Sequence, residues 1–549
     1  MRKKALKIVL FLVLGVSLFF AVQRILTPNW NNYQGSDSSI QGFFALEDDT
    51  LDVLFLGTSH VIYGISPMRL YEQTGIRSYN LGTSGQPIEC SYILLKQAFC
   101  SQHPKVVFLD VSHMFDDKTK MAPYYRNVMD NLYGRSTYWE FAKIYAETDK
   151  SDGFWSAIFP MIKYHTRWTE LDADDLSHPH GVYYSMGQYI HSYAGSPAMS
   201  LASLEQYNAK VFSRGSGTVL TADGDADQSQ VQTDPIYHPQ ITATFTEYVE
   251  KMLALCRENG AELIMMNVPT MKKAVQGGWS TVKAEAAAAF MEQYGLTFVD
   301  LHYADIVDPT YDFIDGGGHL NLNGSEKVMD YLGDFLSGAY PTLPSLGTQN
   351  DQFEAALEKY RMVRRVAQIE MEPDLRRYLS LLDREKDRVT ILISSKSNYI
   401  SGLTEADFEL LRALGLELAD SANYQDTYLA VIRNGKVGYE AVSDRRLTYA
   451  RDLGEISVEM TTGSAYEKGA SQITIDGTNY SLNKRGLNIV VWDNETNLPI
   501  DCVNFDTGSE SRAVTRSKGT VGKLIRAYEE AIQKLPDVSN ERVFSGTDS

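Results

Sequence analysis

A short apolar segment that ends in a glycine constrains the fold of this chain more than any other feature. Residues 51–56 are mostly apolar and Gly57 stops the run, which is typical of a buried strand in a parallel sheet. Ser59 follows just after this strand, ahead of a helix predicted to begin near Pro67. Ligands of open α/β sheets bind outside the carboxyl ends of the strands, so Ser59 is well placed for a nucleophile. A turn serine is the plainer interpretation, because turns favour Gly and Ser without any catalytic role.

Strand and helix patterns alternate along residues 49–342, apart from one long insertion. Further buried strands are predicted at 105–111, 263–268 and 297–301, and helical patterns lie between them. This alternation predicts a doubly wound parallel sheet. The insertion, at about 115–240, is rich in aromatic residues and shows no regular pattern, and a segment of this length is usually a lid or a binding surface.

The first 26 residues predict a membrane anchor. The apolar segment 5–26 is long enough to span ~30 Å of hydrocarbon if Lys7 and Arg24 reach the two interfaces. No small-x-small cleavage site follows it, which favours an uncleaved anchor over a removed signal peptide. Basic residues are concentrated before the segment, so the N-terminus is predicted in the cytoplasm and the bulk of the single-pass protein outside the cell. Residues 27–48 predict a polar stalk.

Charge and cysteine content exclude several classes of function. The chain has 51 Lys and Arg against 70 Asp and Glu, a net charge of −19, which argues against a nucleic-acid partner. Its 4 cysteines show no C-x-x-C spacing, so neither a zinc site nor a disulfide framework is predicted, although Cys90 and Cys100 could pair outside the cytoplasm. No metal and no cofactor are expected.

Three short motifs carry a resemblance to a known family. Two of them, Leu56-Gly-Thr-Ser-His60 and Tyr79-Asn-Leu-Gly82-Thr-Ser-Gly-Gln86, resemble the first two blocks of the SGNH (GDSL-like) hydrolase superfamily. The third, Asp315-Gly-Gly-Gly-His319, resembles its last block. The likeness is greatest to the membrane-anchored bacterial branch, which includes the D-alanyl teichoic acid transfer proteins and the alginate acetyltransferases. The resemblance implies a flavodoxin-like three-layer α/β/α SGNH domain over residues 49–342.

The resemblance assigns a catalytic role to three residues. Ser59 is implied as the nucleophile, His319 as the base that removes its proton, and Asp315 as the carboxylate that orients the histidine. The superfamily spaces the last two as Asp-x-x-His, and here one more residue intervenes, which the three glycines can absorb. Asp312 therefore stays open as an alternative orienter.

An oxyanion hole is implied by the same resemblance. Its donors would be the backbone N–H groups of Ser59 and Gly82. A third donor, usually an asparagine after the second strand, is missing, and the Ser112 hydroxyl could take its place. Two neighbouring histidines, His60 and His113, are expected to have structural or gating roles rather than catalytic ones.

The C-terminal part predicts a second, smaller αβ domain. Residues 343–388 have a charged helical pattern and predict a connector, the domain covers 389–538, and 539–549 form a tail. Three of its segments resemble the interleukin-like EMT inducer (PANDER-like) domain, in an order that a circular permutation would explain: 469–477, 483–493 and 500–507.

This second likeness implies carbohydrate binding, because the module also occurs as a stem module in a glycosyltransferase. Trp492 could supply an aromatic platform and Asn488 a polar contact, although Trp492 lies in an apolar run and a core position is the alternative. In the insertion, Arg167 could steer an anionic glycan, and packing is the plainer interpretation.

Two functions fit these features. In the first, Ser59 carries an acyl group to or from a cell-envelope polysaccharide or teichoic acid, and a membrane-bound O-acyltransferase could be the acyl donor. In the second, the protein is a catalytically degenerate envelope scaffold or glycan-binding partner of such an acyltransferase. The intact pair of Ser59 and His319 favours the first function. The extra residue between Asp315 and His319, together with the missing asparagine, favours the second.

Overall fold

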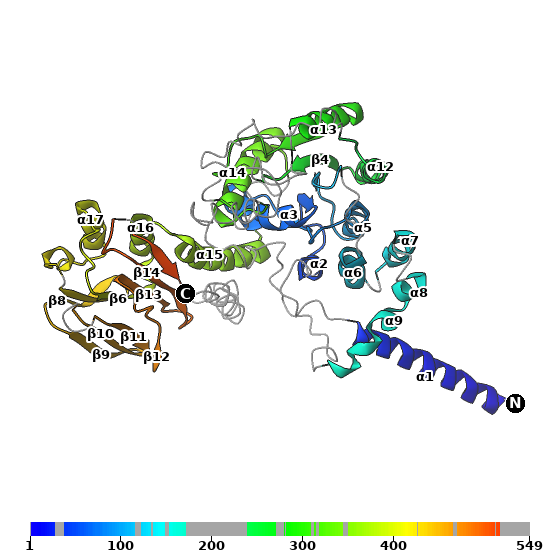
Figure 1. Ribbon diagram of the computed structural model, residues 1–549. Helices are drawn as coiled ribbons and strands as arrows, with labels where there is room; N and C mark the ends of the chain where they lie inside the picture. Colours follow the sequence, from blue (N-terminus) through cyan, green and yellow to red (C-terminus); the bar gives the residue numbers. More distant parts are fainter. Residues whose placement is uncertain are drawn as a thin grey trace, which may run out of the picture. The chain divides into compact units, whose positions relative to one another are not determined.

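The chain divides into two compact units, shown in Figure 1, the first extending to Leu357 and the second running on from Glu358. The computed structural model describes residues 2–27, 38–44, 46–115, 122–132, 135–148, 153–171, 239–270, 279, 281–308, 312–313, 318–343, 350–424, 426–464, 469–510 and 512–516. The division falls within helix α15 (Asp351–Met371), which together with α16 (Leu375–Glu385) occupies the segment predicted to be a helical connector.

The first unit is built on a five-stranded parallel sheet with the order β2-β1-β3-β4-β5. The parallel sheet is therefore as predicted. The strand order reverses between β1 and β3, so the connections that follow these two strands lie on opposite faces of the sheet. Open α/β sheets bind ligands at such a reversal. The strands are β1 (Val53–Leu56), β2 (Ser78–Asn80), β3 (Val106–Asp110), β4 (Glu262–Asn267) and β5 (Thr297–Asp300).

Helices cover both faces of this sheet and bury most of its strand residues. On one face, alternate strand residues such as Phe55 and Phe108, whose rings stack 4.9 Å apart, join a core with Leu332 of α14. The residues that alternate with them, such as Leu54 and Leu109, are buried too. Helix α12 contacts β4 and packs on α5, whereas α14 packs on α4. These helices are α4 (Pro67–Thr74), α5 (Ile88–Ala98), α12 (Ala243–Glu258) and α14 (Leu322–Ala339). Helix α13 (Thr281–Tyr294) contacts β5.

Local sequence signals set where these helices begin and end. The Thr242 side chain accepts a hydrogen bond from the Phe245 N–H (3.1 Å) and caps α12. Asn321 caps α14 in the same way through the Gly324 N–H (3.2 Å). Such caps satisfy donors that have no partner inside the helix. Gly75, with φ 77°, ends α4 in the left-handed conformation that glycine adopts without strain.

The N-terminal helix α1 (Arg2–Leu26) is long and apolar enough to cross a membrane or to serve as a signal sequence, with a candidate span at Lys4–Leu26 of mean hydropathy 2.6. The predicted stalk is shorter than expected, because its last part forms α2 (Ser38–Phe43), and Phe43 packs against Tyr79 of β2 (5.3 Å between ring centroids). Residues 28–37 lie outside the described residues.

The described part of the insertion is helical, although its sequence shows no regular pattern. Its helices have 5 to 11 residues, and so few turns give little periodicity to detect. Residues 116–121, 133–134, 149–152 and 172–238 of the predicted insertion lie outside the described residues. The helices are α6 (Ala122–Asn131), α7 (Tyr138–Thr148), α8 (Gly153–Ile158), α9 (Pro160–Tyr164) and the 3-10 helix η2 (His165–Thr169).

The second unit contains two antiparallel sheets, with the orders β15-β14-β13-β6-β7-β8 and β12-β11-β10-β9. Apolar residues from both sheets form a single core, so the sheets pack face to face. Helix α17 (Glu405–Ala413) packs on α16. The strands are β6 (Val389–Lys396), β7 (Thr427–Arg433), β8 (Lys436–Ser443), β9 (Leu447–Leu453), β10 (Ile456–Thr462), β11 (Ser471–Ile475), β12 (Thr478–Asn479), β13 (Gly486–Asp493), β14 (Pro499–Phe505) and β15 (Val514–Arg516).

Arg516 of β15 joins this sheet to helix α15. Its guanidinium pairs with Asp501 (3.1 Å) and donates to the Ile369 and Glu372 carbonyl oxygens (3.2 and 3.0 Å). Glu370 is fully buried nearby, and burial, with the neighbouring Asp501, raises the pKa of its carboxyl well above the ordinary value.

The core of the second unit makes a prediction about Trp492, which is 5% exposed and packs edge-on against Tyr480 (5.6 Å between ring centroids). We expect Trp492→Ala to lower the free energy of unfolding by about 3–5 kcal/mol, because it leaves a large cavity. Urea unfolding followed by circular dichroism measures this. Val437→Ala, at an exposed site in the same unit, should change it by at most about 0.5 kcal/mol. A loss below about 1 kcal/mol for Trp492→Ala would contradict the core assignment.

Candidate active site

Two residues far apart in the sequence meet at the carboxyl edge of the parallel sheet. Ser59 is the first residue of helix α3 (Ser59–Gly64), which begins directly after β1 with Thr58 as its cap. The His319 Nε2 atom lies 2.8 Å from the Ser59 Oγ atom, within hydrogen-bond distance. His319 itself stands two residues before Asn321, the cap of α14. Two of the three sequence motifs therefore meet as a hydroxyl and an imidazole in direct contact, the arrangement that nucleophilic catalysis needs.

The turn that carries Ser59 requires a glycine at position 57. The φ of Gly57 is 152°, a region that residues with a side chain rarely adopt. A Cβ atom there would lie 2.4 Å from the Asp110 Cβ and 2.6 Å from the Val61 Cγ2. This close approach brings the turn after β1 against the end of β3. Helix α3 therefore begins at the carboxyl edge of the sheet, where Ser59 is found.

Asn80, at the end of β2, ties helix α3 to the sheet. Its side-chain amide donates to the Val61 and Ile65 carbonyl oxygens (2.8 and 2.9 Å), and its oxygen accepts from the Gly82 N–H (2.9 Å). The side chain is 2% exposed, so these bonds form away from water, where an unmade bond is costly. Asn80 therefore fixes the end of α3 and, through it, the position of Ser59.

Asp110, at the end of β3, is the centre of a chain of hydrogen bonds beside the Ser59 turn. The Thr58 hydroxyl donates to one carboxylate oxygen (2.8 Å), and the Ser112 Oγ lies 2.7 and 2.6 Å from the two oxygens. The His60 Nδ1 is in turn 2.7 Å from the Ser112 Oγ. Because a carboxylate only accepts, the Ser112 hydroxyl donates to Asp110 and can accept from His60. A buried carboxylate is thus linked through one hydroxyl to an imidazole next to Ser59.

Two aromatic rings flank His319. The Tyr63 ring centroid lies 4.5 Å from that of His319, and the His60 centroid lies 5.4 Å from it. Both come from α3, the helix that begins with Ser59. The imidazole of His319 therefore packs against two side chains of the same helix that presents the hydroxyl.

Two carboxylates were considered as the group that orients His319. Asp315 lies outside them. Asp312, the alternative, is fully buried, and its Oδ2 accepts from the Lys327 Nζ (2.7 Å) and the Asp308 N–H (2.6 Å). Its Oδ1 makes no hydrogen bond in the described structure, so Asp312 does not hold the His319 ring in this conformation. The Asp312 backbone oxygen accepts from the Asn321 N–H (2.8 Å), and this hydrogen bond joins the two ends of the loop that carries His319.

The three implied oxyanion donors differ in what they already bind. Ser59 is the first residue of α3, a position whose N–H has no partner inside the helix. The Gly82 N–H instead donates to the Asn80 side chain, and the Ser112 hydroxyl donates to Asp110. Of the three implied donors, only the Ser59 N–H therefore lies at the start of a helix, where it has no partner inside the helix.

The tentative glycan-binding residues are engaged elsewhere. The Arg167 guanidinium donates to the Leu26 carbonyl oxygen (2.8 Å) at the end of α1. Asn488 is fully buried and bonds both the N–H and the carbonyl of Lys484 (3.1 and 2.8 Å). Trp492 is part of the core of the second unit. Asn488 and Trp492 are therefore placed as structural residues. This argues against the predicted glycan-binding platform and its polar contact.

Among the described residues, the cysteines add no nucleophile to this site. Cys90 is buried and Cys100 exposed, and neither is in a disulfide. Burial raises the pKa of the Cys90 thiol well above its ordinary value, which makes it a poor nucleophile. Among the described residues, no group of three or more His, Cys, Asp and Glu side chains is placed to hold a metal ion.

Sequence reasoning found Ser59 and His319 but missed the residues that support them. Asn80 lies within the second motif, and Asp110 is a lone charge in an apolar strand at its carboxyl end, which is the signal that could have identified it. In comparisons with known proteins, no protein-family profile matches this chain, and no curated protein is significantly similar to it.

Proposed function

We propose that this protein is an extracytoplasmic serine-dependent O-acyltransferase or esterase that acts on a cell-envelope polysaccharide or teichoic acid. The observation that carries the proposal is the 2.8 Å contact between the Ser59 Oγ and the His319 Nε2 at the carboxyl edge of the sheet. The resemblance of the three motifs to the membrane-anchored SGNH branch supports the substrate class. The family assignment is itself part of the proposal.

The reaction would proceed through an acyl-serine. The Ser59 Oγ attacks the carbonyl carbon of an ester or thioester while its proton passes to the His319 Nε2. The tetrahedral adduct collapses when the C–O or C–S bond of the leaving group breaks, and His319 returns the proton to that group. A sugar hydroxyl or a water then attacks the acyl-serine, again with His319 as base. The first acceptor gives transfer and the second gives hydrolysis. Asp315 remains the proposed orienter of His319.

His60 would supply an oxyanion donor in place of the Ser112 hydroxyl. We propose that His60 acts in its doubly protonated form, with its Nδ1–H donating to the Ser112 hydroxyl, which in turn donates to Asp110. An imidazolium carries a second N–H, on Nε2, and a charge that stabilises an adjacent oxyanion. Together with the Ser59 N–H this provides two donors. We propose this role in place of the structural or gating one expected for His60 from the sequence.

The anchor helix would hold the first unit at the membrane surface. Near its end, the Phe19 ring lies 5.5 Å from that of Phe159, and the Met161 N–H donates to Gln23 (3.1 Å). The helices around this contact expose Trp155 (64%) and Trp168 (71%). Exposed tryptophans beside the end of a membrane span are typical of the lipid–water interface. This supports a helix that stays in the membrane as an anchor.

One observation favours the second candidate, a catalytically degenerate scaffold or glycan-binding partner of a membrane O-acyltransferase. The Gly82 N–H, implied as an oxyanion donor, is bonded to Asn80. A protein whose site had lost its oxyanion hole would keep its fold but would not catalyse the reaction. The two candidates therefore differ in whether Ser59 reacts.

The first kinetic prediction concerns the serine and histidine. We expect Ser59→Ala to abolish hydrolysis of small acetyl esters and thioesters, and His319→Ala to have a comparable effect, because members of such a unit act together. Asp315→Asn should lose at most about 10⁴-fold, through the wrong imidazole tautomer. Stability of Ser59→Ala should stay within about 1 kcal/mol of wild type. A Ser59→Ala protein as active as wild type would end the enzymatic proposal.

The second kinetic prediction concerns His60 and Ser112. We expect His60→Gln to lower kcat by about 10²-fold with little change in KM, the usual effect of removing an oxyanion donor. If Ser112 acts only by holding His60, adding Ser112→Ala to His60→Gln should lower kcat no further. His103→Gln, at an exposed histidine paired with Asp49, is the control and should retain full activity. Effects of His60→Gln and Ser112→Ala that multiply would contradict the linkage.

The third prediction concerns topology. A protease added outside intact cells should release nearly the whole mass as soluble fragments and leave only the α1 peptide in the membrane. The check is mass spectrometry of the membrane fraction. Recovery of a secreted protein that begins between residues 20 and 30 would show cleavage of a signal peptide instead.

A further inference from the structure

A row of aromatic rings extends from the N-terminal helix α1 onto helix α8. Phe19 of α1 packs edge-on against Phe159 (5.5 Å between ring centroids), which lies between α8 and α9. The Phe159 ring stacks on that of Trp155 at 5.9 Å, and Trp155 contacts Phe154 at 5.6 Å. Trp155 and Phe154 are both exposed. The apolar surface of α1 therefore continues onto the helices beside it.

The same helices hold α1 through hydrogen bonds. We call α8, α9 and η2 together the foot (residues 153–169). The Met161 N–H of the foot donates to the Gln23 side chain (3.1 Å), and the Arg167 guanidinium donates to the Leu26 carbonyl oxygen (2.8 Å). Gln23 is fully buried, although it lies in a helix whose other residues are mostly exposed. The foot therefore covers one side of the end of α1.

These contacts place the foot at the depth of the membrane. Phe19, Gln23 and Leu26 all contact the foot, and they have the separations of one helix face. Phe19 stands seven residues before Leu26, the end of the candidate span, so it lies about 10 Å inside that end. Helices that lie in a membrane interface are buried roughly 5–10 Å at the boundary of headgroups and acyl chains. A ring that packs on Phe19, such as that of Phe159, reaches this depth.

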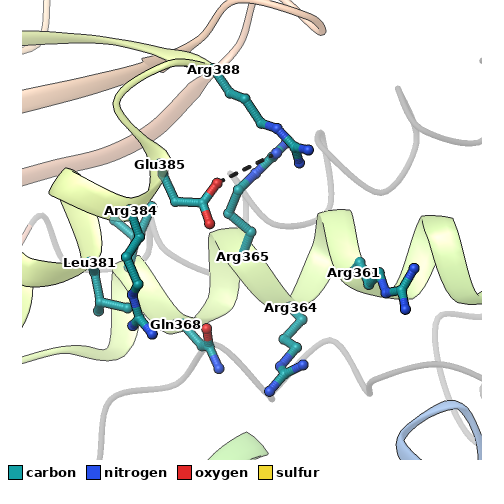
Figure 2. Close-up of a pocket in the computed structure, with 9 residues that line it drawn as sticks. Arg361, Arg364, Arg365, Gln368, Leu381, Arg384, Glu385 and Arg388 are labelled. Atoms are coloured by element: carbon teal, nitrogen blue, oxygen red, sulfur yellow. Dashed lines mark ion pairs between the residues drawn. The ribbon is translucent and has the colours of Figure 1, made fainter. Parts of the chain in front are cut away.

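The composition of the foot suits contact with lipid. Residues 153–169 contain no Asp or Glu, in a chain that has 70 of them, whereas Lys163 and Arg167 are basic. Two more apolar side chains of the foot, Ile162 (50%) and Trp168 (71%), are exposed. Exposed tryptophans with basic neighbours are typical of helices in the membrane interface. The pocket of the second unit drawn in Figure 2 is the opposite, because charged side chains dominate its lining.

The foot is firmly joined to helix α6 of the first unit. The Tyr164 hydroxyl of α9 donates to the Asp130 carboxylate of α6, and Asp130 pairs with Arg126 of the same helix (3.1 Å). Arg126 also donates to the Ser156 carbonyl oxygen of α8 (3.2 Å). Arg126 and Asp130 are buried, and breaking a buried ion pair is strongly destabilising. The foot and α6 therefore form one rigid element.

Helix α6 in turn reaches the candidate active site. A Cβ atom on Gly85 would lie 2.7 Å from the ring of Tyr124, in the first turn of α6. Gly85 belongs to the loop after β2 that also carries Gly82. The depth of the foot in the membrane therefore sets the height of this loop above it.

We propose that the foot is a second membrane attachment, embedded in the lipid–water interface beside the end of α1, with the lipid bilayer as its partner. The proposal rests on the membrane anchor proposed for α1 and goes beyond it. A single span leaves the tilt of a protein open, and interfacial side chains help to fix it. The attachment does not depend on acyl transfer by Ser59.

Fluorescent labels in lipid nanodiscs test the proposal on the full-length protein. Cys100→Ser removes the exposed cysteine, and the other three cysteines are buried. An NBD label is then attached to one added cysteine at a time, through Trp155→Cys, Trp168→Cys or, as the control, Arg384→Cys. All three side chains are exposed, so these variants should fold. Arg384 belongs to the charged lining in Figure 2, a surface that hydrocarbon solvates poorly.

We expect doxyl groups near the lipid headgroups to quench the labels at positions 155 and 168 about threefold more than the label at 384, because only the foot lies at that depth. Iodide in the water should show the reverse order. A further label, through Phe11→Cys in the middle of α1, reports on the span itself, and doxyl groups deep in the bilayer should quench it most.

The label in α1 separates two ways in which the proposal can fail. If the label at position 11 is quenched while those at 155 and 168 behave like the one at 384, the foot is not in lipid and the anchor stands. That result overturns the proposal and assigns the exposed tryptophans to a protein partner. If the label at position 11 is not quenched either, α1 does not span the bilayer, and the proposal falls together with the anchor. Neither result bears on the reactivity of Ser59.

Discussion

The close approach of Gly57 to Asp110 is the constraint on which the site of the first unit depends. No side chain fits between the turn after β1 and the end of β3, where a Cβ would lie 2.4 Å from the Asp110 Cβ. That proximity lets the Asp110 carboxylate accept from Thr58, which caps α3, and from Ser112. Helix α3 is thereby fixed at its start by Asp110 and at its end by Asn80. Ser59, the first residue of α3, takes its position from both.

Local sequence pattern predicted the parts of this arrangement that depend on one segment alone. The apolar strand before Gly57 and the amphipathic helices α12 and α14 were predictable because burial imposes a regular spacing on their residues. The pairing of Ser59 with His319 could be inferred only from the resemblance of their motifs, since 260 residues separate them. The parallel strand β2, only 3 residues long, was too short to give a pattern.

The residues that sequence reasoning missed are polar groups whose partners come from elsewhere in the chain. Asn80 and Asp110 are buried within strands, and although each also binds a group two residues away, the Val61 carbonyl and the Thr58 hydroxyl that they bind lie in a distant segment. Strand β10 was missed although it alternates buried and exposed residues, a spacing typical of a half-buried strand, so the sequence did carry a signal for it. Trp492, for which the sequence left a glycan-binding platform and a core position open, belongs to the core of the second unit.

The central claim is that Ser59 becomes acylated, and intact-mass measurement after incubation with an activated acetyl ester tests it most directly. The account predicts one added acetyl group on the wild-type protein, located at Ser59 by peptide mapping. The same incubation should leave Ser59→Ala unmodified. An adduct that builds up equally on Ser59→Ala, or a wild-type protein that gains no acyl group while remaining folded, would contradict the account and favour the scaffold.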